Sequence, residues 1–513
     1  MARGPHEDLP QLKQRLFVGT PGATAAPRPP AAGAADGWRS YRGNMRRSFS
    51  SPVSVPAEAR VLWKKEHAAA RQAAAGDESG LDYGLGRMAD QWMFEAEFVP
   101  RPPVIAGNRA IVARSTGAVD AYDLESGARL WRAYTGGRIQ SVPTIWRDRI
   151  FVGSCDGFLY ALALDDGREI YRLHAAPKTA RMMFYEQLGS RWPILGSPAV
   201  HDGNVYVMAG LLEEIDDVHA VCADAETGRI LWERSDWTAA ETEGKLTGGG
   251  QFSVADRLFY HGDKAPPIRI DPKDGSCKPA FPETAAKRYN TIHAKDFLKA
   301  WMVPKGQDSA ILDPKWILYG GRRLLVNEGD HGTWRYTPKI LGRDESGGGR
   351  LPVIDLPTCT LLPAWDEHDV FFVSQHRRKQ NLTMIARDKL MDALEGMLSG
   401  TSNADFLAEG VFKRKGFQID FIPAGKGLYR WNVELEGAAD PMMWALSGNA
   451  ALLVYSEHWN RHPPRLAAFA RADGRLMWEI DLPGLPVHSG IAVAAGGRIV
   501  LSMRDGSVLT IGE

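Results

Sequence analysis

The sequence lacks an excess of charge of either sign. Its 513 residues include 62 Lys and Arg against 62 Asp and Glu, so the formal net charge is zero. A protein without a broad basic field has no general attraction to nucleic acid or to an anionic membrane surface. We therefore expect no nucleic-acid partner.

Long apolar runs are also missing. No uninterrupted stretch approaches the roughly 18 residues of a transmembrane helix, so we expect no transmembrane segment. The opening MARGPHEDLPQLKQRLFVGT lacks the order of basic, apolar and small residues that marks a signal peptide. We expect either that the protein is not exported or that this chain starts downstream of a removed leader or of another domain.

Cysteine is scarce and scattered. The four cysteines form no CxxC pair, no CxxCH haem site and no adjacent pair; they are Cys155, Cys222, Cys277 and Cys359. A structural zinc site needs closely spaced thiolates or imidazoles, so we expect no metal site. Free cysteine is among the most buried residue types, and we expect buried thiols.

What the sequence does contain is a repeated glycine with an aromatic residue four positions later. The pairs are Gly127 and Trp131, Gly167 and Tyr171, Gly228 and Trp232, Gly427 and Trp431, and Gly474 and Trp478. A second set of glycines opens alternating runs such as FLYAL; these are Gly117, Gly157 and Gly506. Alternation with period 2 predicts strands, and glycine permits the positive φ of a tight hairpin turn. Asp123 and Asp224 precede their glycines by four residues and can accept hydrogen bonds from turn amides.

This repeat predicts an all-β fold. One such sheet cannot bury both faces, but a ring of sheets can, with each aromatic residue packed against the next unit. Gly127 and Gly167 lie 40 residues apart, which suits four-stranded propeller blades of about 40 to 50 residues. We predict a β-propeller of four-stranded antiparallel blades, eight in number, with seven as the alternative. The proposed blades are 99–135, 138–175, 195–236, 248–282, 312–345, 360–436, 440–482 and a last unit from 485.

The chain divides into a tail and one domain. Residues 1–36 are rich in Ala, Pro and Gly and are predicted to form a flexible tail, and 37–513 a single propeller. The stretch ARVLWKKE, with Trp63, resembles an outer strand, so residues 60–66 are expected to complete the last blade and close the ring. Loop insertions are expected near 66–95, 176–196, 283–310 and 376–415, the last with a short helix from Asp388.

Segment 176–196, APKTARMMFYEQLGSRWPILG, interrupts the chain between two well-formed repeats. Binding residues concentrate on loops that a rigid scaffold holds, so we predict a ligand site near this segment. Its candidate residues are Arg138, Asp156, Arg181, Tyr185, Glu186, Gln187, Arg191 and Trp192. A second candidate lies in GDHGTWRYTP, with His331 and Trp334. The alternative for the first segment is structural: Arg181 and Glu186 form an ion pair and Trp192 wedges between blades.

Three stretches carry a resemblance to a known family. AYDLESGARLW, GSCDGFLYALALDDGREIY and ADAETGRILW resemble the pyrroloquinoline-quinone-type (PQQ-like) repeats of quinoprotein dehydrogenases and of the outer-membrane assembly lipoprotein BamB. The segment from GGRIQSVPTIW to VYVMAG is similar to uncharacterised PQQ-like propellers of planctomycete-type bacteria. The resemblance implies a propeller in the periplasm or otherwise exported. We expect a monomer. It implies no particular activity.

Three functions remain open on these residues. The first is a non-catalytic binding or scaffolding propeller that holds a protein, peptide or glycan at the channel mouth or rim. The second is a carbohydrate-active hydrolase or lyase that uses a channel pair such as Glu186 and Asp156. The third is a PQQ- and calcium-dependent dehydrogenase, although the adjacent-cysteine disulfide of that group is absent. We expect the first, without PQQ, calcium or another cofactor and without enzymatic activity.

Overall fold

Nearly all of the secondary structure is β-strand. The computed structural model describes residues 9, 11–19, 37–66, 99–184, 187–211, 217–237, 246, 248–255, 258–261, 268–279, 309–313, 316–325, 333–342, 353–355, 362–376, 379–392, 412–415, 418–421, 429–435, 439–457 and 463–513. Within this part of the chain, no helix is long and apolar enough to cross a membrane.

The first half of the chain forms four antiparallel sheets. Sheet 1 contains β3 (Val104–Ala106), β4 (Arg109–Ala113), β5 (Ala118–Asp123) and β6 (Arg129–Tyr134). Sheet 2 contains β7 (Thr144–Trp146), β8 (Arg149–Gly153), β9 (Phe158–Ala163), β10 (Glu169–His174) and the N-terminal strand β1 (Leu16–Val18). Sheet 3 contains β13 (Ala199–His201), β14 (Asn204–Ala209), β15 (His219–Asp224) and β16 (Ile230–Arg234). Sheet 4 contains β17 (Gln251–Val254), β18 (Leu258–His261), β19 (Ile268–Ile270) and β20 (Cys277–Pro279).

The second half adds four more sheets. Sheet 5 contains β21 (Ser309–Asp313), β22 (Trp316–Leu325), β23 (Thr333–Gly342), β24 (Val353–Asp355), β29 (Gln418–Phe421) and β28 (Phe412–Lys415). Sheet 6 contains β25 (Ala364–Trp365), β26 (Asp369–His376), β27 (Lys379–Ala386) and β30 (Tyr429–Leu435). Sheet 7 contains β31 (Ala439–Leu446), β32 (Ala450–Glu457), β33 (Arg465–Ala470) and β34 (Leu476–Asp481). Sheet 8 contains β35 (Pro486–Val493), β36 (Ile499–Met503), β37 (Val508–Gly512) and β2 (Arg60–Lys65), with the 3₁₀ turn η1 (Ala495–Gly497) between β35 and β36.

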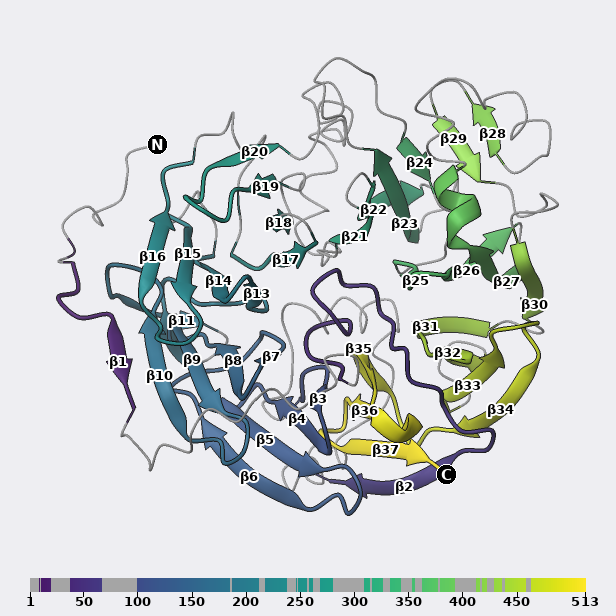
Figure 1. Cartoon of the computed structure of the whole chain (residues 1–513), viewed down its shortest axis with the longest axis horizontal. Helices are drawn as coiled ribbons and strands as arrows, with labels where there is room; N and C mark the ends of the chain where they lie inside the picture. Colours follow the sequence, from purple (N-terminus) through teal and green to yellow (C-terminus); the bar gives the residue numbers. More distant parts are fainter. Residues whose placement is uncertain are drawn as a thin grey trace.

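These sheets stand around a common centre, as Figure 1 shows. Apart from sheet 5, each sheet is built on the span of one blade proposed from the sequence. Sheet 5 extends beyond the proposed 312–345, because β24 pairs with β29, so that β28 and β29, from residues proposed for the sixth blade, join it. The first strands of the sheets line the centre and contact first strands of neighbouring sheets. The arrangement is the β-propeller that the repeat predicts. Its cores lie between the sheets, where the apolar side chains of adjacent sheets meet.

The two ends of the domain meet in sheet 8. Strand β2 pairs antiparallel with β37, so that Trp63 lies opposite Thr510 and Lys65 opposite Val508. This confirms the predicted closing strand. The hairpin turn that other sheets place between their last two strands is missing here, and the Trp478 indole donates instead to Pro56 O (2.9 Å) at the start of the closing segment.

The aromatic residues of the repeat dock onto glycine turns of the next sheet. At Gly167, an added Cβ would lie 2.4 Å from the Trp131 ring, and the Trp131 indole donates to Leu164 O (3.2 Å). Trp63 makes the same contact with Gly127 and donates to Leu124 O (3.0 Å). The same docking joins Trp232 to the Gly275 turn and Trp431 to the Gly474 turn.

The turn chemistry predicted from the repeat is confirmed. The repeat glycines that are described have positive φ; they are Gly117, Gly127, Gly157, Gly167, Gly228, Gly474 and Gly506. Asp123 Oδ1 accepts hydrogen bonds from the Ser126 amide (2.8 Å) and the Glu125 amide (3.1 Å). Three cysteines are buried free thiols, as expected, and Cys359 lies outside the described residues.

Two further predicted boundaries need correction. The N-terminal segment 1–36 includes β1, which pairs with β10 along the outside of sheet 2, because its extended backbone satisfies the open edge of that strand. The predicted insertion 376–415 begins too early, because 379–386 forms β27, the third strand of sheet 6. Residues 387–392 then form the expected helix. Most of 66–95 and 283–310 lies outside the described residues.

The closing contact can be tested by replacing Trp63 with alanine. We expect a loss of about 3 kcal/mol in the free energy of unfolding, since the change removes a docked ring from the seam that joins the chain ends. Urea unfolding followed by circular dichroism measures this loss. The control V61A changes a residue of the same strand that is 41% exposed, and should cost less than about 0.5 kcal/mol. Equal costs for the two variants would contradict the role of the docked ring.

The glycine requirement can be separated into its two causes. Both glycines have positive φ, +73° at Gly167 and +78° at Gly203. The Trp131 ring packs against Gly167, whereas no atom lies within 4 Å of a Cβ added to Gly203. G203A should therefore cost only the backbone strain, of about 1 kcal/mol, and G167A should cost clearly more because the ring must also move. Thermal unfolding of both variants gives the comparison, and equal shifts would show that the ring is irrelevant to the choice of glycine.

Candidate functional site

The centre of the ring is occupied by the chain's own residues 38–51, WRSYRGNMRRSFSS (Figure 1). The backbone of this segment accepts hydrogen bonds from the first strands of several sheets in ring order. The bonds run from Ile105 N to Trp38 O (2.7 Å), from Ile145 N to Arg39 O (2.7 Å), from Val254 N to Met45 O (2.8 Å), from Trp365 N to Ser48 O (2.9 Å) and from Leu446 N to Phe49 O (3.0 Å). We call residues 38–51 the axial segment.

Two buried arginines fix the axial segment in place. Arg47 donates from Nε to Phe252 O (2.9 Å) and from Nη1 to Tyr41 O (2.9 Å). Arg42 reaches Leu362 O (3.3 Å), and its guanidinium lies over the Phe49 ring. Both arginines and Phe49 have positive φ. This backbone conformation is strained for residues other than glycine, so it persists only where the surrounding contacts hold it in place. The axial segment is therefore an integral part of the ring.

The structure places two of the predicted site residues, Arg138 and Asp156, around one turn. Arg138 is buried, and its carbonyl accepts from Cys155 N (2.8 Å). Asp156, in the same turn, accepts from Tyr160 Oη (2.6 Å) and from Phe158 N (3.0 Å). Ser190 completes the cluster, because its amide donates to Cys155 O (2.8 Å). Sequence reasoning thus placed Arg138 and Asp156 beside segment 176–196, where the structure has them.

Trp192 lies in the core. It is 4% exposed, packs within the apolar cluster of sheets 2 and 3, and its ring stands edge-on to His219 with centroids 6.2 Å apart. The structural alternative for this residue, a wedge between blades, describes its position. Arg191 is half-buried, and its amide donates to Ala180 O (3.0 Å).

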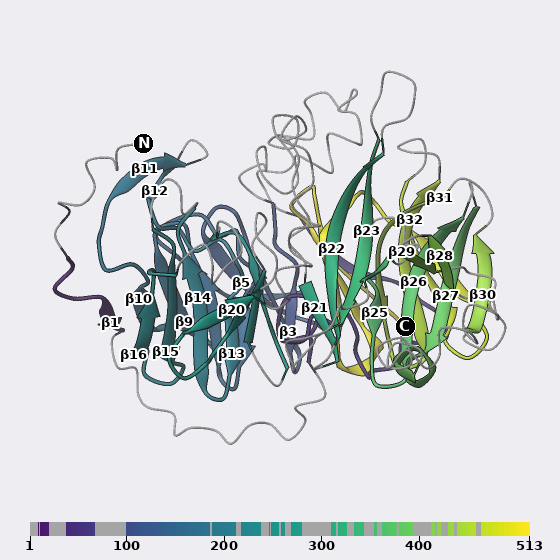
Figure 2. The same ribbon diagram turned by 90° about the horizontal axis from the view of Figure 1, so that it is seen from above.

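The central part of segment 176–196 is a two-stranded hairpin of β11 (Arg181–Phe184) and β12 (Gln187–Ser190). Arg181 is exposed and pairs with Ser190, and Phe184 pairs with Gln187. Figure 2 shows the hairpin standing beyond the ends of the neighbouring sheets. Tyr185 and Glu186, at its turn, lie outside the described residues.

The hairpin exposes two apolar side chains that sequence reasoning missed. Met183 and Leu188 are direct cross-strand partners and are 65% and 55% exposed. The signal available in the sequence was the stretch MMFYEQL, in which apolar residues flank a short polar stretch on both sides. Because cross-strand partners project from the same face, these two side chains form one apolar surface, which we call the hairpin face.

The second predicted site falls on sheet 5. Trp334 belongs to β23 and pairs with Leu324 of β22, while His331 lies outside the described residues. Strands β22 and β23 rise at the same end of the ring as β11 and β12 (Figure 2). The ligand roles proposed for these residues stay predictions.

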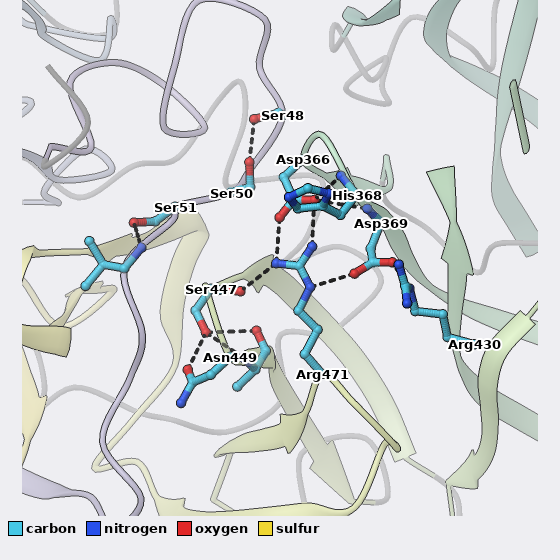
Figure 3. Close-up of polar contacts among 12 residues, drawn as sticks. Ser48, Ser50, Ser51, Asp366, His368, Asp369, Arg430, Ser447, Asn449 and Arg471 are labelled. Carbon is cyan, nitrogen blue, oxygen red and sulfur yellow. Dashed lines mark hydrogen bonds and ion pairs between the residues drawn. The ribbon is translucent and has the colours of Figure 1, made fainter. Parts of the chain in front are cut away.

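A polar network joins sheets 6 and 7 (Figure 3). Arg471 donates from Nε to Asp369 Oδ2 (2.6 Å), from Nη2 to Asp366 Oδ1 (2.6 Å) and from Nη1 to Ser447 O (3.3 Å). The other oxygen of Asp369 accepts from Arg430. Because guanidinium groups bind their oxygens, these carboxylates link the two sheets and are poorly placed for proton transfer. We call such a link between sheets a tie.

A similar tie joins sheets 1 and 8. Asp120 is fully buried and accepts from Arg114 Nε (2.9 Å) and from Arg132 Nε (2.6 Å). Arg114 also donates to Gly506 O (2.8 Å) across the closing interface. Burial raises the pKa of Asp120, but the hydrogen bonds and charges of the two arginines outweigh it, so the pKa lies below its ordinary value. The carboxylate is therefore held ionised inside the ring.

The described residues contain no group of three or more His, Cys, Asp or Glu side chains that could hold a metal ion. Calcium binding to a protein takes six to eight oxygen ligands, usually including several carboxylates. The buried carboxylates of this part of the chain, Asp120 and Asp369, are paired with arginines instead. These two carboxylates are therefore engaged by guanidinium groups and not by a metal ion.

Comparison with known proteins supports the fold. Residues 53–187 match the family model described as outer membrane protein assembly factor BamB. No curated protein matches the sequence. The structure is similar to quinohemoprotein alcohol dehydrogenase from Comamonas testosteroni, with a TM-score of 0.51, 13% identity, and coverage of 94% of this chain and 81% of that chain. It is also similar to BamB from Moraxella catarrhalis, with a TM-score of 0.31, 12% identity, and coverage of 79% and 82%.

The tie between sheets 6 and 7 can be tested with R471A. At neutral pH we expect a loss of about 3 kcal/mol, because two largely buried carboxylates lose their shared cation. Burial raises the pKa of Asp366, but the hydrogen bond from Arg471 outweighs it, so the pKa lies below the ordinary 3.8. A depressed folded-state pKa gives stability that is present above the ordinary value and is lost as the pH falls through the folded value. The cost of R471A should therefore shrink as the pH falls below about 4.

Urea unfolding at about pH 7, 5 and 3 measures this dependence. The control is R168A, because the Arg168–Asp166 pair is exposed and 3.8 Å long and such pairs contribute about 0.5 kcal/mol or less. A cost of R471A that equals that of R168A, or that does not change with pH, would contradict the tie.

Proposed function

We propose that the protein is a non-catalytic binding propeller that holds a protein partner at its rim, through the hairpin face of Met183 and Leu188. The observation that carries this proposal is the hairpin itself. It stands outside the sheets, it is not part of the repeat, and it presents two large apolar side chains to solvent. Exposed apolar side chains gathered on one face are typical of protein contact sites.

Two exposed leucines of the repeat have a different origin. Leu130 and Leu231 each precede the docking tryptophan of their repeat and lie on the outer strands of their sheets. Successive side chains of a strand point to opposite faces. Because the tryptophan faces the neighbouring sheet, the leucine before it faces solvent. The hairpin face has no such explanation within the fold.

An enzyme that works in the central channel has less support. The axial segment occupies the ring centre and is hydrogen-bonded to the first strands of sheets 1, 2, 4, 6 and 7. The carboxylate of Asp156, one of the two acids considered for a hydrolase or lyase, is engaged through both of its oxygens by Tyr160 and by Phe158 N. A general acid or base needs an oxygen that can reach the substrate.

A PQQ-dependent dehydrogenase has less support still. The similarity to an alcohol dehydrogenase rests on 13% identity, and a shared fold does not imply a shared activity. Among the described residues, the two buried carboxylates, Asp120 and Asp369, are paired with arginines, and no group of three or more His, Cys, Asp or Glu side chains could hold a metal ion. Absorbance of a bound quinone, or calcium-dependent dye reduction by the purified protein, would favour the dehydrogenase over the binding propeller.

The proposal includes a location outside the cytoplasm. The family model that matches residues 53–187 is described as an outer membrane protein assembly factor. A hairpin at the rim suits docking to another protein of an assembly. We propose the periplasm, or an equivalent exported compartment, as the place where the partner is met. A peptide or glycan partner is the alternative at the same face.

The hairpin face can be tested with M183D/L188D. In the full chain expressed in its own host, we expect this variant to lose the proteins that co-purify with wild type, because a charge must be desolvated in the apolar contact. Quantitative mass spectrometry of the co-purified proteins measures the loss. The double variant should unfold at the same temperature as wild type, since both side chains are exposed.

The matched control is L130D/L231D, which places two aspartates on exposed apolar positions of the outer strands. It should keep the partners. Retention of all partners by M183D/L188D, or equal loss by the two double variants, would reject the hairpin face as the contact.

A further inference from the structure

The N-terminal segment is bound to sheet 2 as an added strand. Residues 11–19 run antiparallel to β10 along its outer edge, as the β1 strand of Figure 1 shows. The backbone bonds are Leu12 N to Pro177 O (2.7 Å), His174 N to Arg15 O (2.9 Å) and Gly19 N to Ile170 O (2.8 Å). An extended peptide that adds to an open sheet edge gains affinity from these bonds and specificity from its alternate side chains.

The first side-chain pocket holds Arg15. Its Nη1 lies 2.5 Å from Glu233 Oε2 on β16, its Nε donates to His174 O (3.0 Å), and its Nη2 donates to Ala175 O. Burial raises the pKa of Glu233, but hydrogen bonds from His219 and Arg15 outweigh it, so the pKa lies below its ordinary value. One ionised carboxylate and two carbonyls suit the fork of a guanidinium, whereas a lysine ammonium could not span them.

The second pocket holds Leu16. An added Cβ on Gly228 would lie 2.7 Å from both Leu16 Cδ1 and the Tyr171 ring. At the equivalent Gly167 the larger Trp131 ring supplies all three of the nearest atoms. Sheet 2 thus carries a tyrosine where other sheets carry a tryptophan, and an aliphatic side chain from the added strand shares the cover of the glycine turn.

A third contact holds Phe17. Its ring meets Phe158 edge-on with centroids 6.0 Å apart, and the Arg172 guanidinium lies 5.2 Å from its centroid. The next residue, Val18, is 74% exposed. The edge therefore reads three consecutive positions, an arginine, an aliphatic residue and an aromatic residue, and leaves the fourth in solvent.

We propose that the outer edge of β10, with Glu233 and Gly228, is a binding site for an extended peptide of the pattern arginine, aliphatic, aromatic. The chain's own residues 11–19 occupy it as a tethered ligand, and a segment of a partner protein with the same pattern replaces them. Residues 20–36, rich in Ala, Pro and Gly, join this strand to the axial segment. A tethered ligand has an effective concentration of about mM, so the tail sets a threshold that a partner must exceed.

The test uses the full chain with the substitutions R15E/F17A, which we call the disarmed variant. These substitutions weaken the binding of the chain's own tail and leave the residues of the site unchanged. The probe is a fluorescein-labelled peptide of residues 9–20, LPQLKQRLFVGT, measured by fluorescence anisotropy. We expect R15E/F17A to bind this peptide at least tenfold more tightly than wild type, whose own tail competes. Adding E233Q to the disarmed variant should weaken binding at least tenfold.

Peptide controls define the pattern that the edge reads. A peptide carrying R15E or F17A should bind at least tenfold more weakly, whereas one carrying K13A, at an exposed position, should bind as the unchanged peptide does. Adding M183D/L188D to the disarmed variant should leave peptide binding unchanged, which separates this site from the hairpin face. Equal binding by wild type and R15E/F17A, or equal binding of the R15E and unchanged peptides, would overturn the proposal.

Discussion

The ring depends on one recurrent interaction, the docking of an aromatic ring onto a glycine turn of the next sheet. The turn position must be glycine for two reasons. Its backbone φ is positive, and a Cβ at this position would overlap the docked aromatic side chain; a Cβ added to Gly167 would lie 2.4 Å from Trp131. The indole also satisfies a turn carbonyl that the neighbouring sheet leaves open. Trp63 uses the same contact at the seam where the two chain ends meet. The contact of the repeat is therefore also used where the ring closes.

In the described part of the chain, the interior of the ring is filled by structural contacts, and both contact surfaces proposed above lie outside it. The axial segment fills the centre, and the buried carboxylates of Asp120 and Asp369 are neutralised by arginines that reach between sheets. Buried polar groups that are fully paired confer specificity on the packing and offer little to a substrate. The hairpin face and the edge of β10 lie close together along the chain, since residues 11–12 meet residues 177–178 just before β11. The two proposed contact surfaces are therefore adjacent.

Sequence reasoning reached part of the candidate site. It placed Arg138 and Asp156 beside segment 176–196, because the repeat fixed which turns face which loops. It could not tell that Trp192 packs into the core while Met183 and Leu188 face solvent. All three are large apolar residues in one short segment, and composition alone gives them the same tendency to be buried. Only the hairpin register, which places Met183 opposite Leu188, decides which side chains point away from the sheets.

By itself, the sequence determined the all-β repeat, the glycine turns, the spans of the sheets other than sheet 5 and the closure by the strand that holds Trp63. These features follow from signals between residues a few positions apart, such as positive φ at a turn and alternation along a strand. The tertiary structure alone decided that residues 38–51 fill the axis, that β1 adds to β10, and that β27 belongs to sheet 6. Each of these depends on which open edge or cavity an extended segment meets in space, and an extended segment carries the same local pattern wherever it docks.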